Sequence, residues 1–171
     1  MAQEKLLIDA NALITPHLQY YPFDLAPSFW QQLENSIKDG TVVVLDIVKA
    51  EVLQGTDSLR DWMEALEIGE LIDRRRPEIL AKYSQVLTHL QTNPCYQEAA
   101  LREWSKASVA DPWIVATAAA YGYTIITLEK PILGLSPKAP TKKPKIPDVA
   151  RALSVQTQDL FYLMRKLNFR L

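Results

Sequence analysis

Short apolar runs alternate with amphipathic stretches along this chain of 171 residues. Lys5–Ile8 and Thr41–Leu45 are nearly continuous apolar segments, and the second is rich in β-branched side chains. Tyr123–Thr127 has the same character and lies between Gly122 and the polar turn that leads to Pro131. Continuous runs of this length are typical of parallel strands that are buried on both faces. The pattern therefore predicts these three strands.

Helical patterns separate the predicted strands. Asp111 as N-cap and Pro112 at the first helical position predict a helix that ends at Gly122. Ser28 is expected to cap a helix over residues 29–38, and Asp57 or Ser58 one that runs to about residue 67. Further helices are predicted at 47–53, 148–153 and 158–166, and an edge strand at 154–157. The region 68–107 is also predicted to be helical, with breaks before Pro77 and around Asn93–Pro94. Strands that alternate with helices predict an α/β sandwich with a mostly parallel sheet.

The composition fits a single globular domain over residues 1–171. The chain is 48% hydrophobic and 23% charged, and a domain of this length buries roughly 70% of its unfolded surface. A single cysteine excludes an internal disulfide and suits a reducing compartment. No signal peptide and no apolar run near ~18 residues is present, so a cytoplasmic protein without membrane contact is expected. The net charge of −1 offers no bulk attraction to nucleic acid.

Three acids stand where predicted elements begin or end, and a fourth can point toward the same edge of the sheet. Asp9 and Glu129 follow strands, Asp111 opens a helix, and Glu51 lies on the helix after the second strand. In open parallel sheets the carboxyl ends of the strands form the ligand crevice. Four carboxylates within ~5 Å would repel by about 3 kcal/mol per pair at an effective dielectric constant near 20. Such a cluster is therefore expected to bind a cation.

The ligand chemistry narrows the choice of cation. Oxygen ligands without a nearby His or Cys favour Mg²⁺ or Mn²⁺ over zinc. Such ions polarise a phosphodiester and activate water for in-line hydrolysis. The pattern thus predicts a metal-dependent hydrolase of phosphodiester bonds.

Ordered motifs extend this prediction. The chain contains Asp9-Ala-Asn11-Ala-Leu-Ile14, then Glu51, then ADPWIVATAAAYGYTIITLE at 110–129 and KIPDVARALSVQTQDLFYLMRKL at 145–167. In this order the motifs resemble those of the PIN-domain ribonucleases, in particular an uncharacterised bacterial subgroup. The resemblance spans nearly the whole chain. It implies a PIN-like three-layer α/β/α sandwich and a metal-dependent ribonuclease, often the toxin of a toxin–antitoxin pair.

Roles follow from the resemblance residue by residue. It implies that Asp9, Glu51, Asp111 and Glu129 are the catalytic and metal ligands for Mg²⁺ or Mn²⁺, and that Asn11 and Thr127 orient them. RNA is the implied substrate, and an antitoxin protein and a homodimer are implied partners. Two departures are the Glu at 129, where the family more often has Asp, and a long helical insert between Glu51 and Asp111.

Other interpretations remain open. Asp111 could only cap its helix, Glu51 could be an ordinary surface residue, and Glu129 could lie in a solvated turn. A PIN-like module with incomplete chemistry that binds nucleic acid or a protein is the main alternative, and a phosphatase or DNA nuclease using the same acids is a weaker one. An enzyme should lose turnover on chelation, whereas a binding module should hold RNA equally well in EDTA.

Two groups of cations could contact RNA phosphates. Residues 132–147 carry four prolines and no acid before Asp148, and the lysines of this segment are Lys138, Lys142, Lys143 and Lys145. They are candidate RNA contacts, although a flexible surface loop has the same composition. The run Arg74–Arg76 is interpreted as a solvated helix face, and the four tryptophans as core residues.

Overall fold

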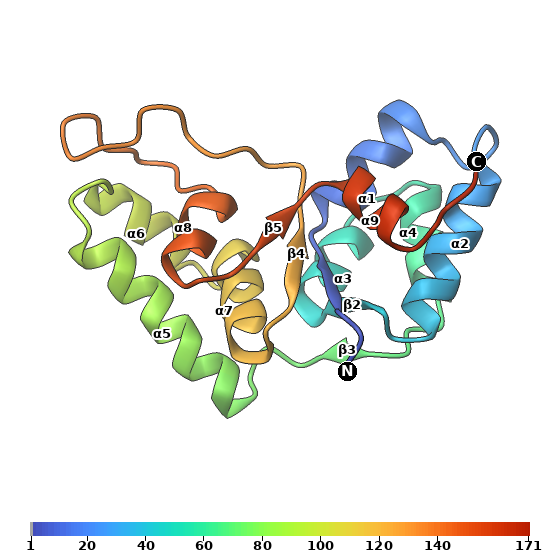
Figure 1. The fold of residues 1–171 in the computed structure, drawn as a ribbon, viewed down its shortest axis with the longest axis horizontal. Coiled ribbons are helices and arrows are strands. Elements are labelled where there is room, and N and C mark those ends of the chain that lie inside the picture. The colour runs from blue at the N-terminus through green and yellow to red at the C-terminus, as the bar shows by residue number, and fades with distance from the viewer. Residues whose placement is uncertain (1) are drawn as a thin grey trace. The chain divides into compact units, whose positions relative to one another are not determined.

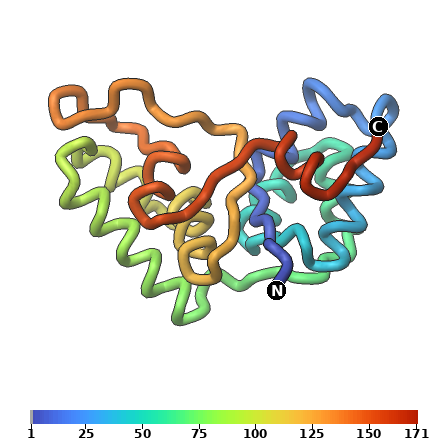
Figure 2. The backbone as a smooth tube through the Cα atoms, viewed as in Figure 1, coloured from blue at the N-terminus to red at the C-terminus, as the bar shows by residue number. Residues whose placement is uncertain are grey.

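The computed structural model describes residues 2–171, and its contacts divide this part of the chain into two compact units. Unit 1 comprises the residues up to Asp73 together with Thr124–Leu128 and Gln158–Leu171. Unit 2 comprises Arg74–Tyr123 and Glu129–Thr157. The backbone therefore passes repeatedly from one unit to the other, as the colours along the tube in Figure 2 show.

The sheet is built from strands in the order β3-β2-β1-β4-β5. β1 pairs in parallel with both β2 and β4, and β2 pairs in parallel with β3 (Figure 1). Every residue of β1, β2 and β4 is buried, which explains why β1 and β2 are unbroken apolar runs. The strands are β1 (Leu6–Ile8), β2 (Val42–Leu45), β3 (Leu71–Ile72), β4 (Thr124–Ile126) and β5 (Thr157–Gln158). The predicted α/β class with a parallel central sheet is confirmed, and it fits a three-layer α/β/α sandwich.

The register of the sheet aligns the ends of two strands in unit 1. Leu7 lies opposite Ile125, and Ile8 lies opposite Ile126. The next backbone amide, that of Asp9, donates to the carbonyl of Ile126 at 2.9 Å. The residues that follow β1 and β4 therefore leave the sheet at the same edge.

Helix α2 (Pro27–Lys38) of unit 1 buries an apolar stripe. Pro27 is the first residue of α2, where its missing N–H leaves no bond unmade. Phe29, Leu33 and Ile37 follow at intervals of four and are fully buried. The helical segments of this unit are α1 (Asn11–Thr15), the π-helix η1 (Pro16–Tyr20), α2 (Pro27–Lys38), α3 (Asp46–Leu53), α4 (Ser58–Ala65) and α9 (Leu160–Lys166).

Unit 2 is helical. Its helices are α5 (Pro77–Thr92), α6 (Glu98–Trp104), α7 (Asp111–Tyr121) and α8 (Ile146–Ala152). The residues of α7 from Ile114 to Ala118 are all buried, so this helix is apolar around most of its circumference. Gly122 ends it in the left-handed conformation, with φ of 70°, as the sequence predicted. No helix within residues 2–171 is long and apolar enough to cross a membrane.

Two predicted helix caps are wrong. Asp111 is the first residue of α7, and the N-cap is Ala110, which already has helical dihedral angles. A capping side chain belongs to a residue with an extended backbone just before the helix, so Asp111 is not the N-cap. Ser28 likewise is not an N-cap, because it lies inside α2; the N-cap is Ala26, and Pro27 is the first helical residue. The predicted cap at Asp57 is confirmed, because its carboxylate accepts a hydrogen bond from the amide of Arg60 at 3.2 Å.

The interpretation of residues 68–107 as helical is wrong at its start. Leu71–Ile72 form strand β3, beside Val44 and Leu45 of β2. Arg74–Arg76 then form a turn before Pro77, so this run is not a helix face. The edge strand predicted at 154–157 is shifted to Thr157–Gln158. Helices α5 and α6 confirm the breaks expected before Pro77 and around Asn93–Pro94.

Candidate functional site

The buried polar centre of unit 1 lies where β1 and β4 end. Asp9 is 5% exposed and Thr127 is 3% exposed, although both carry polar side chains. Asp9 follows β1 and Thr127 follows β4, so the aligned strand ends bring them to one edge. The hydroxyl of Thr127 donates to Oδ2 of Asp9 at 2.8 Å. A buried carboxylate needs such donors, because burial without them is costly.

Asn11 orients this hydroxyl. The amide of Leu128 donates to Oδ1 of Asn11 at 2.9 Å, which fixes the orientation of the side-chain amide. Nδ2 of Asn11 then donates to Oγ1 of Thr127 at 3.2 Å. The hydroxyl has one proton, which goes to the charged acceptor on Asp9 rather than to Oδ1 of Asn11 at 3.4 Å. The structure thus joins Asn11, Thr127 and Asp9 in one directed chain of hydrogen bonds.

Glu51 is the second predicted ligand in unit 1. It lies on α3, which starts directly after β2. Its side chain reaches solvent, yet desolvation by the surrounding protein raises the pKa of its carboxyl. Within residues 2–171 it has no hydrogen-bond or ion-pair partner. Glu51 is therefore a desolvated carboxyl that the described protein does not compensate.

Asp46 is an acid that the sequence reasoning left unassigned. It follows the last residue of β2 and is the first residue of α3. Its Oδ1 accepts a hydrogen bond from the amide of Ile47 at 2.7 Å. The pattern of an apolar run followed by Asp is the same as at Ile8–Asp9, and this repetition could have indicated Asp46 as a third candidate in unit 1.

Asp111 and Glu129 belong to unit 2. Asp111 is half-buried in the first turn of α7, where the helix dipole favours a negative charge. Glu129 has a side chain that is 17% exposed. Its Oε2 accepts from the amide of Ile146 at 2.7 Å, and its Oε1 lies 3.6 Å from Nζ of Lys145. Glu129 therefore joins the two ends of the loop that precedes α8.

The lysine-rich loop is attached to the rest of unit 2. The amide of Thr141 donates to the carbonyl of Cys95, and the carbonyl of Thr141 accepts from the amide of Gln97, both at 2.9 Å. The side chains of Lys138, Lys142 and Lys143 are exposed, whereas that of Lys145 is half-buried beside Glu129. Three of the four candidate RNA contacts thus face solvent from an anchored loop.

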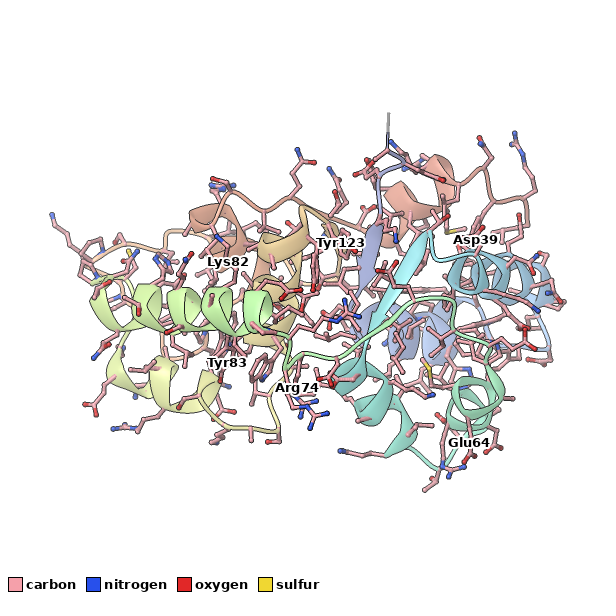
Figure 3. The ribbon with its side chains drawn as sticks, turned by 90° about the horizontal axis from the view of Figure 1, so that it is seen from below. Asp39, Glu64, Arg74, Lys82, Tyr83 and Tyr123 are labelled. Carbon is pink, nitrogen blue, oxygen red and sulfur yellow. The ribbon has the colours of Figure 1, made fainter. Side chains whose placement is uncertain are left out.

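An aromatic stack stands near the start of α7. The rings of Tyr83 and Trp113 are stacked with centroids 3.8 Å apart, and the guanidinium of Arg74 lies 5.7 Å from the Trp113 ring centroid. Figure 3 labels Arg74 and Tyr83, which lie close together in that view. Trp113 therefore contacts both a ring and a cation, and Arg74 makes a cation–π interaction with it.

The donor set is compatible with a hard divalent cation. Within residues 2–171, no group of three or more His, Cys, Asp and Glu side chains is arranged to hold a metal ion. Mg²⁺, however, usually binds through one or two carboxylates and completes its coordination with water and substrate phosphate. Asp9 and Glu51 offer oxygen donors only, which is the chemistry that Mg²⁺ and Mn²⁺ prefer. The donor chemistry of these two side chains thus suits a hard divalent cation.

The fold and these residues define an α/β protein with an acid held at the carboxyl edge of a parallel sheet. A model of the family DUF4411, described as a domain of unknown function, matches residues 6–171. The chain belongs to this family, and the match covers residues of both units. A search of curated proteins finds no match. The resemblance to PIN-domain ribonucleases stays a prediction.

Proposed function

We propose that this protein is a metal-dependent endoribonuclease that hydrolyses RNA phosphodiester bonds with Mg²⁺ or Mn²⁺. The observation that carries the proposal is the buried carboxylate of Asp9, which is oriented by Thr127 and Asn11 at the edge where two parallel strands end. Ligand sites of parallel sheets lie at this edge. The resemblance of the motifs around these residues to PIN-domain ribonucleases supports the choice of RNA.

Each residue of unit 1 has a separate task in this proposal. A divalent cation, when bound, would polarise the phosphodiester and lower the pKa of the attacking water. Asp9 contributes the first carboxylate ligand, and Thr127 holds it in one orientation through the bond to Oδ2. Glu51 contributes a second carboxylate, whose desolvated charge a cation would compensate. Asn11 acts as a positioning residue through Thr127.

The remaining predictions have no support beyond the sequence. A toxin function with an antitoxin partner and a homodimer rest on the resemblance, and ligation by Asp111 and Glu129 rests on the resemblance and on their positions beside predicted elements. RNA contact by the lysine loop rests on its charge pattern, and a cytoplasmic location rests on the composition. Glu129 already accepts from the backbone of Ile146. Ligation through it would therefore compete with the closure of its loop.

The test compares the wild type with Asp9→Asn for cleavage of a mixed-sequence RNA in Mn²⁺. The substitution keeps an oxygen acceptor for Thr127 and removes the charge, so the fold is expected to survive. The matched control is Asp61→Asn, which removes the same charge from a side chain that is 76% exposed on α4. We expect the Asp9 variant to lose cleavage at least about 100-fold, because a charged ligand at the reacting phosphate is lost.

Two results would overturn the proposal. One is RNA cleavage by Asp9→Asn at the rate of the control variant. The other is an absence of cleavage by the wild type in Mn²⁺, with RNA bound equally well in Mn²⁺ and in EDTA. The second result would replace the enzyme by a module that binds nucleic acid.

A further inference from the structure

A concave surface lies in unit 1, among α9, the segment after it and Tyr21. It is a hollow of about 460 Å³. Phe161 and Arg165 of α9 line it, together with Phe169 and Arg170 of the segment that follows. The volume lies within the range of sites that hold small ligands. None of the residues named as ligands of the proposed metal lines this hollow.

The hollow is formed by ordered local structure. Helix α9 ends where Asn168 adopts a left-handed conformation with φ of 57°. The amide of Phe169 then donates to the carbonyl of Met164 at 2.8 Å, as in a Schellman motif. This bond turns the chain so that Phe169 packs against Phe29 of α2, with ring centroids 6.0 Å apart. The wall of the hollow is therefore fixed by a helix-terminating turn.

Gln32 holds the rest of that wall. Its Oε1 accepts from the backbone amide of Arg170 at 2.9 Å, and its Nε2 donates to the carbonyl of the same residue at 2.7 Å. The two bonds resemble the paired backbone hydrogen bonds between neighbouring strands, and they fix the backbone of Arg170 against α2. The guanidinium of Arg170 is consequently carried on an anchored backbone.

Both guanidinium groups at the hollow lack an acidic partner. Within residues 2–171, the guanidinium groups of Arg165 and Arg170 make no ion pair and no hydrogen bond. Their neighbour Lys166, by contrast, pairs with Glu4 at 2.8 Å. No Asp or Glu side chain lines the hollow. The hollow is thus lined by two arginines whose guanidinium groups make no ion pair within residues 2–171.

An exposed ring accompanies these cations. Phe161 is 50% exposed, and the guanidinium of Arg165 lies 5.8 Å from its ring centroid. Tyr21 and Phe169 add aromatic surface to the lining. Flat rings beside arginines suit single-stranded nucleic acid, because bases stack on rings and phosphates pair with guanidinium groups. An acidic peptide could form ion pairs with the arginines, but its carboxylates would not stack on the aromatic rings.

We propose that this hollow binds a segment of single-stranded RNA, with a base stacked on Phe161 and phosphates contacted by Arg165 and Arg170. The choice of RNA over DNA rests on the proposed function. The hollow acts as a secondary binding subsite and takes no part in bond cleavage.

The experiment measures the binding of a fluorescent single-stranded RNA by anisotropy. The RNA has about 12 nucleotides, a length within the site sizes of single-strand binding proteins. The buffer contains EDTA, so that cleavage does not interfere. The test variants are Arg165→Gln combined with Arg170→Gln, and Phe161→Ala. The matched control combines Arg60→Gln with Arg102→Gln, which removes two arginines that pair with acids on exposed helix faces. Leu80→Ala, at a leucine that is 44% exposed on α5, controls for the loss of apolar surface.

We expect each test variant to weaken binding about tenfold, because a stacked base or two phosphate contacts are lost. The double arginine variant should also lower the slope of log K against log salt concentration by about 1.4, at roughly 0.7 per phosphate contact. The control variants should bind as the wild type does. Thermal unfolding of each variant verifies that it is folded.

The outcomes separate this inference from the proposed function. Equal binding by the test and control variants overturns the inference and leaves Mn²⁺-dependent cleavage as it was. An absence of RNA binding by the wild type in EDTA overturns it as well. Weakened binding by the test variants supports the subsite even where the wild type cleaves no RNA, in which case only the nuclease proposal fails.

Discussion

The hydrogen bond from Thr127 to Asp9 can be tested by Thr127→Val. Valine has the shape of threonine, so the change removes the hydroxyl and leaves the packing. It removes the donor to Oδ2 of Asp9 at 2.8 Å and the acceptor for Nδ2 of Asn11 at 3.2 Å. Asp9 is 5% exposed, so water replaces the lost donor poorly. The carboxylate is therefore expected to be less stable in the folded protein.

The magnitude follows from the charge and the burial. A hydrogen bond to a charged group contributes about 1.5–3 kcal/mol to stability, and the added methyl group of valine returns about 0.8 kcal/mol. With the acceptor for Asn11 also lost, the net loss is about 2 kcal/mol. For a chain of this length, 1 kcal/mol changes Tm by about 2–4 °C. We expect Tm to fall by about 6 °C, as measured by circular dichroism in EDTA at neutral pH.

Thr117→Val is the matched control. Thr117 is also fully buried, but its hydroxyl donates to a neutral acceptor, the carbonyl of Trp113, at 2.7 Å. Losing a neutral bond of about 1 kcal/mol is nearly offset by the added methyl group. The control variant should unfold within about 2 °C of the wild type.

A double-mutant cycle with Asp9→Asn isolates the effect of the charge. In that background the acceptor is a neutral amide, so Thr127→Val should cost about 1 kcal/mol less than in the wild type. Equal unfolding temperatures of Thr127→Val and the control variant would contradict a stabilising bond from Thr127 to a charged Asp9. An equal cost of Thr127→Val in the wild type and in the Asp9→Asn background would contradict it as well.

Two further predictions concern stability. Desolvation raises the pKa of the Glu51 carboxyl in the folded protein above its unfolded value near 4.5. The folded state therefore binds the proton more tightly, which favours folding below the unfolded pKa. This contribution to stability is lost as the pH rises through the folded pKa. Glu51→Gln should therefore unfold about 1–2 °C above the wild type near pH 7 and level with it near pH 3.5. The control is Glu103→Gln, at an exposed glutamate that pairs with Lys106. Equal melting curves of Glu51→Gln and the wild type at both pH values, or a gain shared by the control, would contradict this prediction. Gly69→Ala places a Cβ 2.1 Å from the backbone carbonyl oxygen of Lys38, so urea unfolding should show a loss of about 3 kcal/mol. Gly55→Ala, whose nearest contact is 3.3 Å, should lose under about 1 kcal/mol, and similar losses in both would refute the clash.

The sequence predicted the elements that have a strong local signal. β1 and β2 are apolar in every position, and the ends of α7 carry Pro112 and Gly122. Strand β3 has two residues, and one of them, Leu71, is 42% exposed. Such a segment becomes a strand only because β2 offers a partner, and that partner lies far away in the sequence. Local pattern could not predict it.

The candidate site was predictable in part for the same reason. Asp9 and Thr127 each follow an apolar run, so their arrival at one edge follows from the parallel pairing of β1 and β4. The direction of the hydrogen bonds depends on the amide of Leu128, which fixes Asn11. The misplaced cap at Asp111 arose because Ala110 has helical dihedral angles, which its side chain does not signal.

The two glutamates of the predicted ligand set differ in what a cation would change. Glu129 has a backbone donor at 2.7 Å and Lys145 at 3.6 Å, so binding a cation would remove existing interactions. Glu51 has neither kind of partner within residues 2–171, and burial raises the pKa of its carboxyl. A cation that lies beside Glu51 would stabilise the charged carboxylate, and so offset the cost of its desolvation, without breaking a bond. Of the two, Glu51 is therefore the stronger candidate ligand, and the added arm length of Glu129 is already used to close its loop.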